Sequence, residues 1–121
     1  MKNHADILKI DSNDAITEVV IFQNVVYLAG QVPDDDRLDI IGQSQQVFAN
    51  IDKALAQAGT DKSRLLTAQI LLRDLTDFEQ FNQQWKAWLH GCTPPARATL
   101  QAHLVNPNWR IEIMVTAAMP M

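Results

Sequence analysis

The sequence predicts an α+β domain in which two helices pack on one face of a mixed β-sheet. Three observations predict this class. Apolar runs typical of strands lie near both ends of the chain, two segments between them carry apolar residues at helical spacing, and another apolar run separates these two segments. The resulting order is ββ(β)αβαββ. With 121 residues and no repeat or linker-like stretch, the chain is expected to form a single domain over residues 1–121.

The N-terminal part of the chain predicts a β-hairpin. Residues 19–22 and 25–29 are rich in β-branched and aromatic side chains, which favour strands. Gln23 and Asn24 between them fit a tight turn, because Asn tolerates a positive φ. A further short strand, at about residues 7–10, is expected to precede the hairpin.

A long helix and a central strand are predicted next. Between Leu38 and Ala58, apolar residues recur at steps of three and four, as they do on one face of a helix. Asp36 is expected to cap the start of this helix and Gly59 its end. The nearly continuous apolar run at residues 65–72 is typical of a central strand that is covered on both faces.

A second helix is predicted by a capping box and an apolar face. Thr76 and Glu79 have the spacing at which a hydroxyl and a carboxylate satisfy the free backbone N–H groups of a helix start. Large apolar side chains then fall on one face, at Phe78, Phe81, Trp85, Trp88 and Leu89. Gly91 is placed to end the helix.

Two alternating strands, at residues 96–104 and 110–117, are the most informative feature. Each has one apolar and one polar face. If the two strands pair antiparallel with their apolar faces together, Glu112 lies opposite Thr99, and Arg97 lies one pleat further on. The sequence therefore predicts a guanidinium, a hydroxyl and a carboxylate on one patch of sheet.

The chemistry of such a patch follows from its groups. The planar fork of Arg97 binds a carboxylate with two hydrogen bonds. Glu112 within reach would orient or deprotonate a water molecule, and the Thr99 hydroxyl would hold that water or polarise a ligand atom. The alternative is an exposed sheet face with a surface ion pair, worth about 0–1 kcal/mol.

Composition excludes several classes of partner. Ten Lys and Arg against fourteen Asp and Glu give a net charge of −4, and the absence of a basic cluster argues against nucleic-acid binding. No stretch approaches the roughly 20 apolar residues of a membrane span. The first six residues lack the apolar core of a signal peptide, so a cytoplasmic location is expected.

Neither a metal nor a disulfide is expected. Cys92 is the only cysteine, which leaves no partner for a disulfide within the chain. The histidines, His4, His90 and His103, are scattered without ligand spacing. Cys92 is interpreted as a free thiol near a helix end, since no histidine is placed in sequence to activate it as a nucleophile.

Several stretches, in order along the chain, resemble the signatures of the Rid family, also called the YjgF family, part of which carries an endoribonuclease L-PSP label. The resemblance covers about residues 19–118. The strongest stretch is Pro95-Ala96-Arg97-Ala98-Thr99, followed by Ile111-Glu112-Ile113. The others are Tyr27-Leu28-Ala29-Gly30-Gln31-Val32-Pro33, Ile51-Asp52-Lys53-Ala54-Leu55, Ile70-Leu71-Leu72-Arg73-Asp74-Leu75-Thr76-Asp77-Phe78 and Phe81-Asn82.

The resemblance implies a chorismate-mutase-like fold assembled as a homotrimer, with equivalent sites in clefts between subunits. It implies a hydrolase that uses no cofactor and converts reactive 2-imino or enamino acids to 2-keto acids and ammonia. Arg97 falls on the position that holds the substrate carboxylate, and Glu112 on the acidic residue credited with positioning water. Gly30 and Asn82 fall on positions that line the cleft.

Some positions depart from the family pattern. Thr99 replaces a cysteine common in the deaminases, and Ala29 replaces a common serine. In typical members an aromatic residue stacks against the substrate side chain. This residue would fall near Ile16, whose aliphatic side chain cannot stack. The loop at residues 89–95 is shorter than in the best-known branch. These changes preserve the contact between Arg97 and the substrate carboxylate. They affect which imino acid the site prefers.

Two other functions are weighed against the deaminase. The first is a trimer that binds or senses small carboxylates without turnover, which the residues at Ile16 and Ala29 favour. The second is a ribonuclease, against which the acidic charge and the lack of paired histidines argue. In each case the small size of the chain favours an assembly, because a sheet with helices on one face leaves its other face uncovered.

Overall fold

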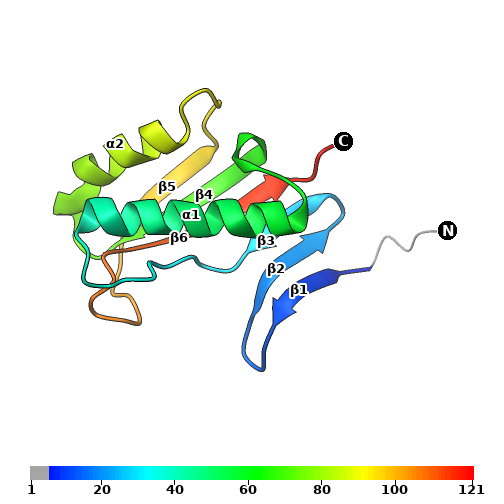
Figure 1. Cartoon of the computed structure of the whole chain (residues 1–121), viewed down its shortest axis with the longest axis horizontal. Coiled ribbons are helices and arrows are strands. Elements are labelled where there is room, and N and C mark those ends of the chain that lie inside the picture. The colour runs from blue at the N-terminus through cyan, green and yellow to red at the C-terminus, as the bar shows by residue number, and fades with distance from the viewer. Residues whose placement is uncertain (1–5) are drawn as a thin grey trace.

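A six-stranded sheet in the order β1-β2-β3-β6-β4-β5 carries two helices on one face in the computed structural model, which describes residues 6–121 (Figure 1). The predicted α+β class, with two helices on one face of a mixed sheet, is confirmed. The strands are β1 (Leu8–Ser12), β2 (Thr17–Phe22), β3 (Val25–Leu28), β4 (Leu65–Leu72), β5 (Ala96–Gln101) and β6 (Ile111–Ala118), and the helices are α1 (Ile40–Ala58) and α2 (Phe78–Trp88).

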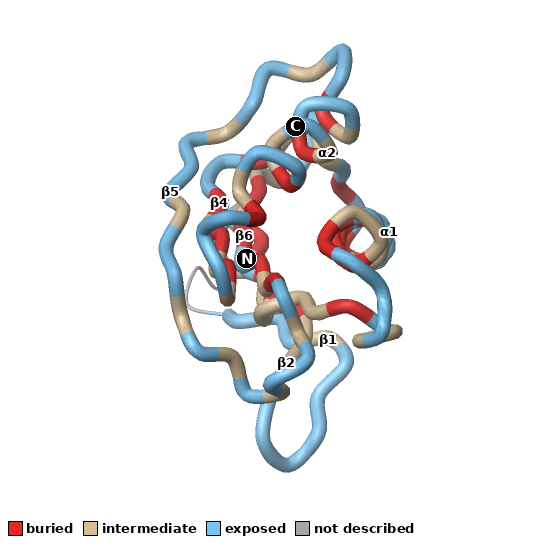
Figure 2. Tube along the Cα trace, turned by 90° about the vertical axis from the view of Figure 1, so that its left-hand side faces the viewer, coloured by how far each residue is buried: buried red, intermediate tan, exposed pale blue. Residues whose placement is uncertain are grey.

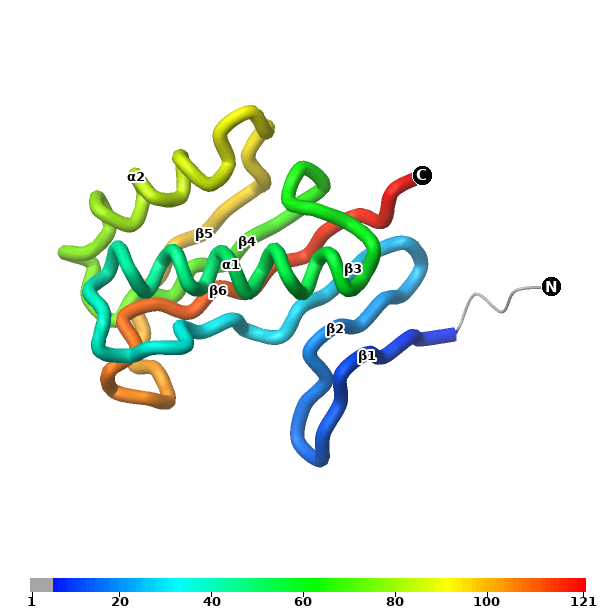
Figure 3. Tube along the Cα trace, in the orientation of Figure 1, coloured from blue at the N-terminus to red at the C-terminus, as the bar shows by residue number. Residues whose placement is uncertain are grey.

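The sheet is mixed because α2 forms the crossover between β4 and β5. These two strands run parallel, as expected for strands joined through a helix, and all other neighbours are antiparallel. The path of the chain in Figure 3 leaves β4, passes through α2 and returns along β5 at the sheet edge. The predicted strand at residues 65–72 is confirmed as β4, an interior strand between β6 and β5. The expectation that both of its faces are covered is wrong, because the helices cover one face of the sheet and alternate residues of β4 such as Gln69 and Leu71 are only half-buried.

The predicted hairpin is confirmed as β2 and β3. Gln23 and Asn24 both adopt a positive φ, 50° and 69° respectively, which is the conformation of a two-residue hairpin turn. The short strand expected before the hairpin is β1, which pairs antiparallel with β2 and forms one edge of the sheet.

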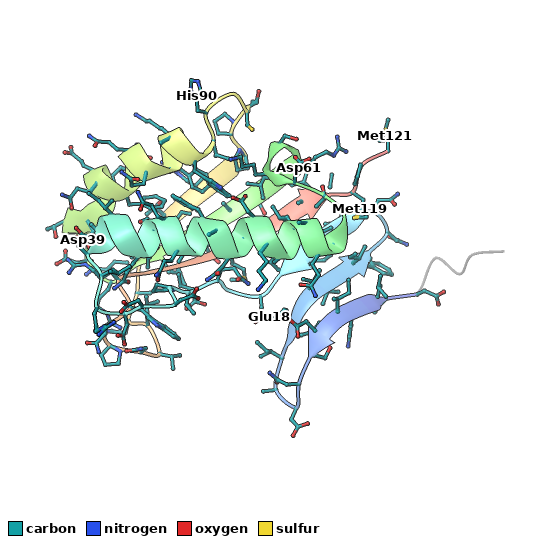
Figure 4. The ribbon with its side chains drawn as sticks, in the orientation of Figure 1. Glu18, Asp39, Asp61, His90, Met119 and Met121 are labelled. Carbon is teal, nitrogen blue, oxygen red and sulfur yellow. The ribbon has the colours of Figure 1, made fainter. Side chains whose placement is uncertain are left out.

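The first helix ends as predicted but begins with a different cap. Asp39, at the start of α1 in Figure 4, accepts a hydrogen bond of 2.9 Å from the Gly42 N–H, so the prediction of Asp36 as the cap is wrong. Asp36 instead accepts a hydrogen bond from the Asn106 side chain at 2.9 Å. Gly59 ends the helix with φ 92°, as predicted.

The capping box predicted for the second helix does not form. Asp74 accepts a hydrogen bond of 2.9 Å from the Thr76 N–H and begins a 3₁₀ turn, Leu75–Asp77, that leads into α2. The prediction of Thr76 and Glu79 as a box is therefore wrong, because the tight turn shifts the helix start past Thr76. Gly91, with φ 85°, lies in the turn after the helix, as predicted.

The core lies between the helices and the sheet face that they cover. Figure 2 shows the buried residues on the inner sides of α1 and α2 and on β4 and β6, whereas β5 is mostly exposed. The fully buried side chains include Phe81, Ile51, Leu55, Ile70, Leu72, Ile111 and Ile113. No helix among residues 6–121 is long and apolar enough to cross a membrane.

Candidate active site

The two alternating strands that carry the predicted site are not neighbours. β4 lies between them: Thr99 of β5 pairs with Ile70, and Glu112 of β6 pairs with Leu71. The predicted antiparallel pairing of Glu112 with Thr99 is therefore wrong. The physical reason is the position of β4, which forms one hydrogen-bonded ladder with β6 and another with β5 and so keeps these two strands apart.

This topology places Arg97 and Glu112 on opposite faces of the sheet. Arg97 pairs across the strands with the buried Ala68, so its side chain points to the helix-covered face, where its guanidinium contacts α2. Glu112 lies between the buried Ile111 and Ile113, so its side chain points to the other, open face. The prediction that both groups meet on one patch of a single chain is wrong.

Arg97 is held by α2 through one hydrogen bond and two aromatic rings. Its Nη1 donates to Asn82 Oδ1 at 2.7 Å. The guanidinium carbon lies 5.4 Å from the Trp85 ring centroid and 5.6 Å from that of Phe78, within the range of cation–π attraction. No carboxylate among residues 6–121 forms an ion pair with Arg97, so its charge is available to an anionic ligand.

Sequence reasoning assigned Phe78 and Trp85 to the core and missed their contact with Arg97. Both belong to the apolar stripe of α2, and Trp85 is only 4% exposed. The signal that was available is the position of Asn82, which lies four residues after Phe78 and three before Trp85, and therefore on the same helical face. A polar residue between two aromatics on a core face marks the place where a polar partner approaches.

Glu112 and Gly30 form a second group, on the open face. The backbone of Gln31 bridges Ile113 through hydrogen bonds of 2.8 and 3.0 Å, which holds the segment after β3 beside β6. A Cβ at Gly30 would overlap Glu112 Oε2, so only glycine admits the carboxylate in this position. Glu112 is half-buried, and this burial raises the pKa of its carboxyl above the ordinary value.

The remaining predicted residues divide between the two groups. Thr99 is half-buried on the helix-covered face of β5, one pleat from Arg97. Ile16 is 48% exposed in the turn before β2, near the sheet edge formed by β1, whereas β5 forms the opposite edge (Figure 1). The structure thus joins Arg97 with Asn82 and Gly30 with Glu112, and it separates Ile16 from Arg97.

A cleft of about 530 Å³ adjoins Arg97 between the end of α2 and the loop that leads to β5. Its volume lies within the range typical of small-molecule sites. Among residues 6–121, no three His, Cys, Asp or Glu side chains are arranged to hold a metal ion. His4 lies outside the described residues, as does most of the segment that was assessed for a signal peptide.

Comparisons with known proteins agree with this fold. The family model described as Endoribonuclease L-PSP matches residues 7–119. A RutC family protein from Haemophilus ducreyi is 44% identical over 112 residues, which cover 93% of this chain and 96% of the relative. The crystal structure of a YjgF-family protein from Neisseria meningitidis superposes with a TM-score of 0.94 at 36% identity, over 98% of this chain and 99% of that one.

The chain therefore belongs to the Rid (YjgF) family, as the resemblance in its motifs predicts. A more distant relative carries a named activity. The 2-iminobutanoate/2-iminopropanoate deaminase from Rattus norvegicus is 28% identical over 109 residues, which cover 85% of this chain and 79% of the relative.

Proposed function

We propose that the protein hydrolyses reactive 2-imino or enamino acids to 2-keto acids and ammonia without a cofactor, at sites shared between the subunits of a homotrimer. The observation that carries this proposal is the arginine of β5. Arg97 is oriented by Asn82 and two aromatic rings and has no carboxylate partner within the described chain. The distant relatives named as imine deaminases support the class of reaction.

In the proposed reaction Arg97 binds the substrate carboxylate and so fixes the adjacent C=N carbon. A water oxygen adds to that carbon, and the π electrons of the C=N bond move to nitrogen. The water gives up one proton, and the product is a carbinolamine. The proton from the water passes to the nitrogen. The C–N bond then breaks as the hydroxyl becomes a carbonyl, and the hydroxyl proton also passes to the nitrogen, which leaves as ammonia. Because protonated imines are already electrophilic, positioning is the main contribution of the site.

Glu112 positions the attacking water in this proposal, and a second copy of the chain must supply it. Within one chain the carboxylate of Glu112 and the guanidinium of Arg97 lie on opposite faces of the sheet. When the open face of one subunit lies against the β5 edge of the next, Glu112 and Gly30 of one copy approach Arg97 and Asn82 of the other. The Thr99 hydroxyl, beside Arg97, is a further ligand for the water.

Keto acid release from an amino acid oxidised in situ tests the proposal. Wild type is expected to accelerate keto acid formation, and Arg97→Ala is expected to abolish the acceleration, since binding of the carboxylate is lost. Arg37→Ala is the matched control, because it removes the same charge at an exposed ion pair with Asp35. Equal acceleration by wild type and Arg97→Ala would contradict the role of Arg97.

Binding without turnover is the second candidate function. Ile16 and Ala29 stand where the family commonly has an aromatic residue and a serine. The absence of that aromatic ring and of that hydroxyl favours a sensor over an enzyme. Calorimetry with 2-keto acids beside the deaminase assay separates the two functions, since a sensor binds the keto acid and leaves imine decay unchanged. RNA cleavage that survives purification and is lost in Arg97→Ala would favour a ribonuclease instead.

A further inference from the structure

The cleft beside Arg97 has basic groups and no acidic ones in its wall. Arg97, Lys86 and His90 line it together with the apolar Trp85, Leu89 and Pro95, and no Asp or Glu contributes. This is unusual for a chain in which fourteen acidic residues outnumber ten basic ones. Two other clefts, by contrast, are each lined by three Asp or Glu residues.

Lys86 is the second permanent cation of this cleft. It lies four residues after Asn82 on α2, so the two side chains are neighbours on one helical face, and Asn82 contacts Arg97. Lys86 is exposed and forms no ion pair with a carboxylate of residues 6–121. The ammonium and the guanidinium therefore border the same cleft, one from α2 and the other from β5.

Resting on the proposed function, we infer that this cleft selects 2-imino acids whose side chain ends in a second carboxylate. Arg97 binds the carboxylate next to the imine, and Lys86 binds the distal one. The methylene groups between them lie against Trp85, Leu89 and Pro95. His90, on the turn that follows α2 (Figure 4), adds a polar group at the same end of the cleft.

The charges and the size of the cleft both favour a dicarboxylate. A monocarboxylate would neutralise Arg97 and leave the Lys86 ammonium without an anion, whereas a dicarboxylate satisfies both groups. A cation in the substrate side chain would be repelled by both of them. The cleft volume of about 530 Å³ accommodates a small dicarboxylic acid with its solvating water.

Calorimetry of the wild-type protein with two keto acids tests the inference. The probes are 2-oxoglutarate and 2-oxobutanoate, which share the keto acid group and differ in the distal carboxylate. We expect 2-oxoglutarate to bind about three- to fivefold more tightly, because Lys86 is exposed and a solvent-screened charge pair contributes modestly. Lys86→Gln should remove that advantage and change the affinity for 2-oxobutanoate less than about twofold.

Lys53→Gln is the matched control, because Lys53 is an exposed lysine of α1 that does not line this cleft. It should leave the ratio of the two affinities unchanged. Equal affinities of wild type for the two keto acids, or an equal effect of Lys86→Gln on both, would overturn the inference.

Imine hydrolysis measured beside calorimetry separates this inference from the proposed function. If 2-oxoglutarate binds through Lys86 but no imine is hydrolysed faster, the deaminase proposal fails and the dicarboxylate site stands. If imines are hydrolysed with no preference for the product of glutamate oxidation over that of alanine, and Lys86→Gln has no effect, the deaminase proposal stands and the dicarboxylate inference fails.

Discussion

The two faces of the sheet differ sharply in burial. Neighbouring residues of β6 illustrate the difference: Ile113, under the helices, is fully buried, whereas Met114, on the open face, is 43% exposed. Buried apolar side chains fill the helix-covered face. The open face also carries large apolar side chains, including Tyr27, Leu71, Leu100 and Met114, with no helix above them.

This difference indicates that each face has its own role. The helix-covered face stabilises the fold of one chain through burial of apolar area. An exposed apolar sheet face is a liability for a monomer and is typical of a surface that another molecule covers. The candidate catalytic groups follow the same division, because Arg97 lies on one face and Glu112 on the other.

Truncation of Ile113 should produce the largest loss of stability. We expect Ile113→Ala to lower the free energy of unfolding by about 2–5 kcal/mol, since it leaves a cavity beneath the helices. The matched change, Met114→Ala, should act mainly through assembly, so its effect on urea unfolding should depend on protein concentration. A concentration-independent loss of equal size in both variants would remove the distinction between the two faces.

A charge on the open face should disrupt assembly while the chain remains folded. Met114→Lys is expected to shift the protein from the proposed trimer to smaller species in sedimentation velocity, because a buried ammonium without a partner is costly. Gln83→Lys adds the same charge to an exposed position of α2 and should leave assembly unchanged. A Met114→Lys protein that remains fully trimeric would show that the open face is not the interface.

The pH dependence of the reaction should report the burial of Glu112. Burial raises the pKa of this carboxyl above its ordinary 4.5, so it protonates at a higher pH than an exposed glutamate. The unfolding free energy contributed by the group therefore decreases as pH rises through the raised pKa. Activity follows the ionised carboxylate, so the rate should fall in the acidic range as the pH decreases through the pKa of Glu112.

The pH–rate profiles of wild type and Glu112→Gln test this assignment directly, through the fall of the rate on the acidic side. This fall should be absent from whatever activity the variant retains, since glutamine does not titrate. An unchanged fall in Glu112→Gln would assign the titration to another group, or to the imine itself.

The smallest expected effect concerns the cap of α1. Asp39→Ala should lower the free energy of unfolding by about 1 kcal/mol, because the Gly42 N–H loses its acceptor. Activity per folded chain should remain unchanged, since Asp39 belongs to neither group of candidate site residues. Thermal unfolding measures the first quantity and keto acid release the second, and a large loss of activity would link this helix end to the site.

Local patterns in the sequence predicted the helices and strands. They did not predict the order of the strands in the sheet. The Gln23-Asn24 turn, the apolar stripe of α1 and the run at residues 65–72 each depend on neighbouring residues, and each was confirmed. The pairing of Glu112 with Thr99 depended on which strand lies between β5 and β6, and alternation along a strand carries no such information. The same limit hid the contact of Trp85 with Arg97.

Mixing two impaired variants tests the shared site most directly. In the proposed trimer, pure Arg97→Ala is expected to be inactive and pure Glu112→Gln to retain only a small residual rate. In randomly mixed trimers, a cleft is intact when the Glu112→Gln subunit supplies Arg97 and its neighbour supplies Glu112. In a cyclic trimer, an equal mixture should therefore regain about a quarter of wild-type activity. Recovery near this level supports a site that two subunits share, and no recovery after verified subunit exchange would contradict it.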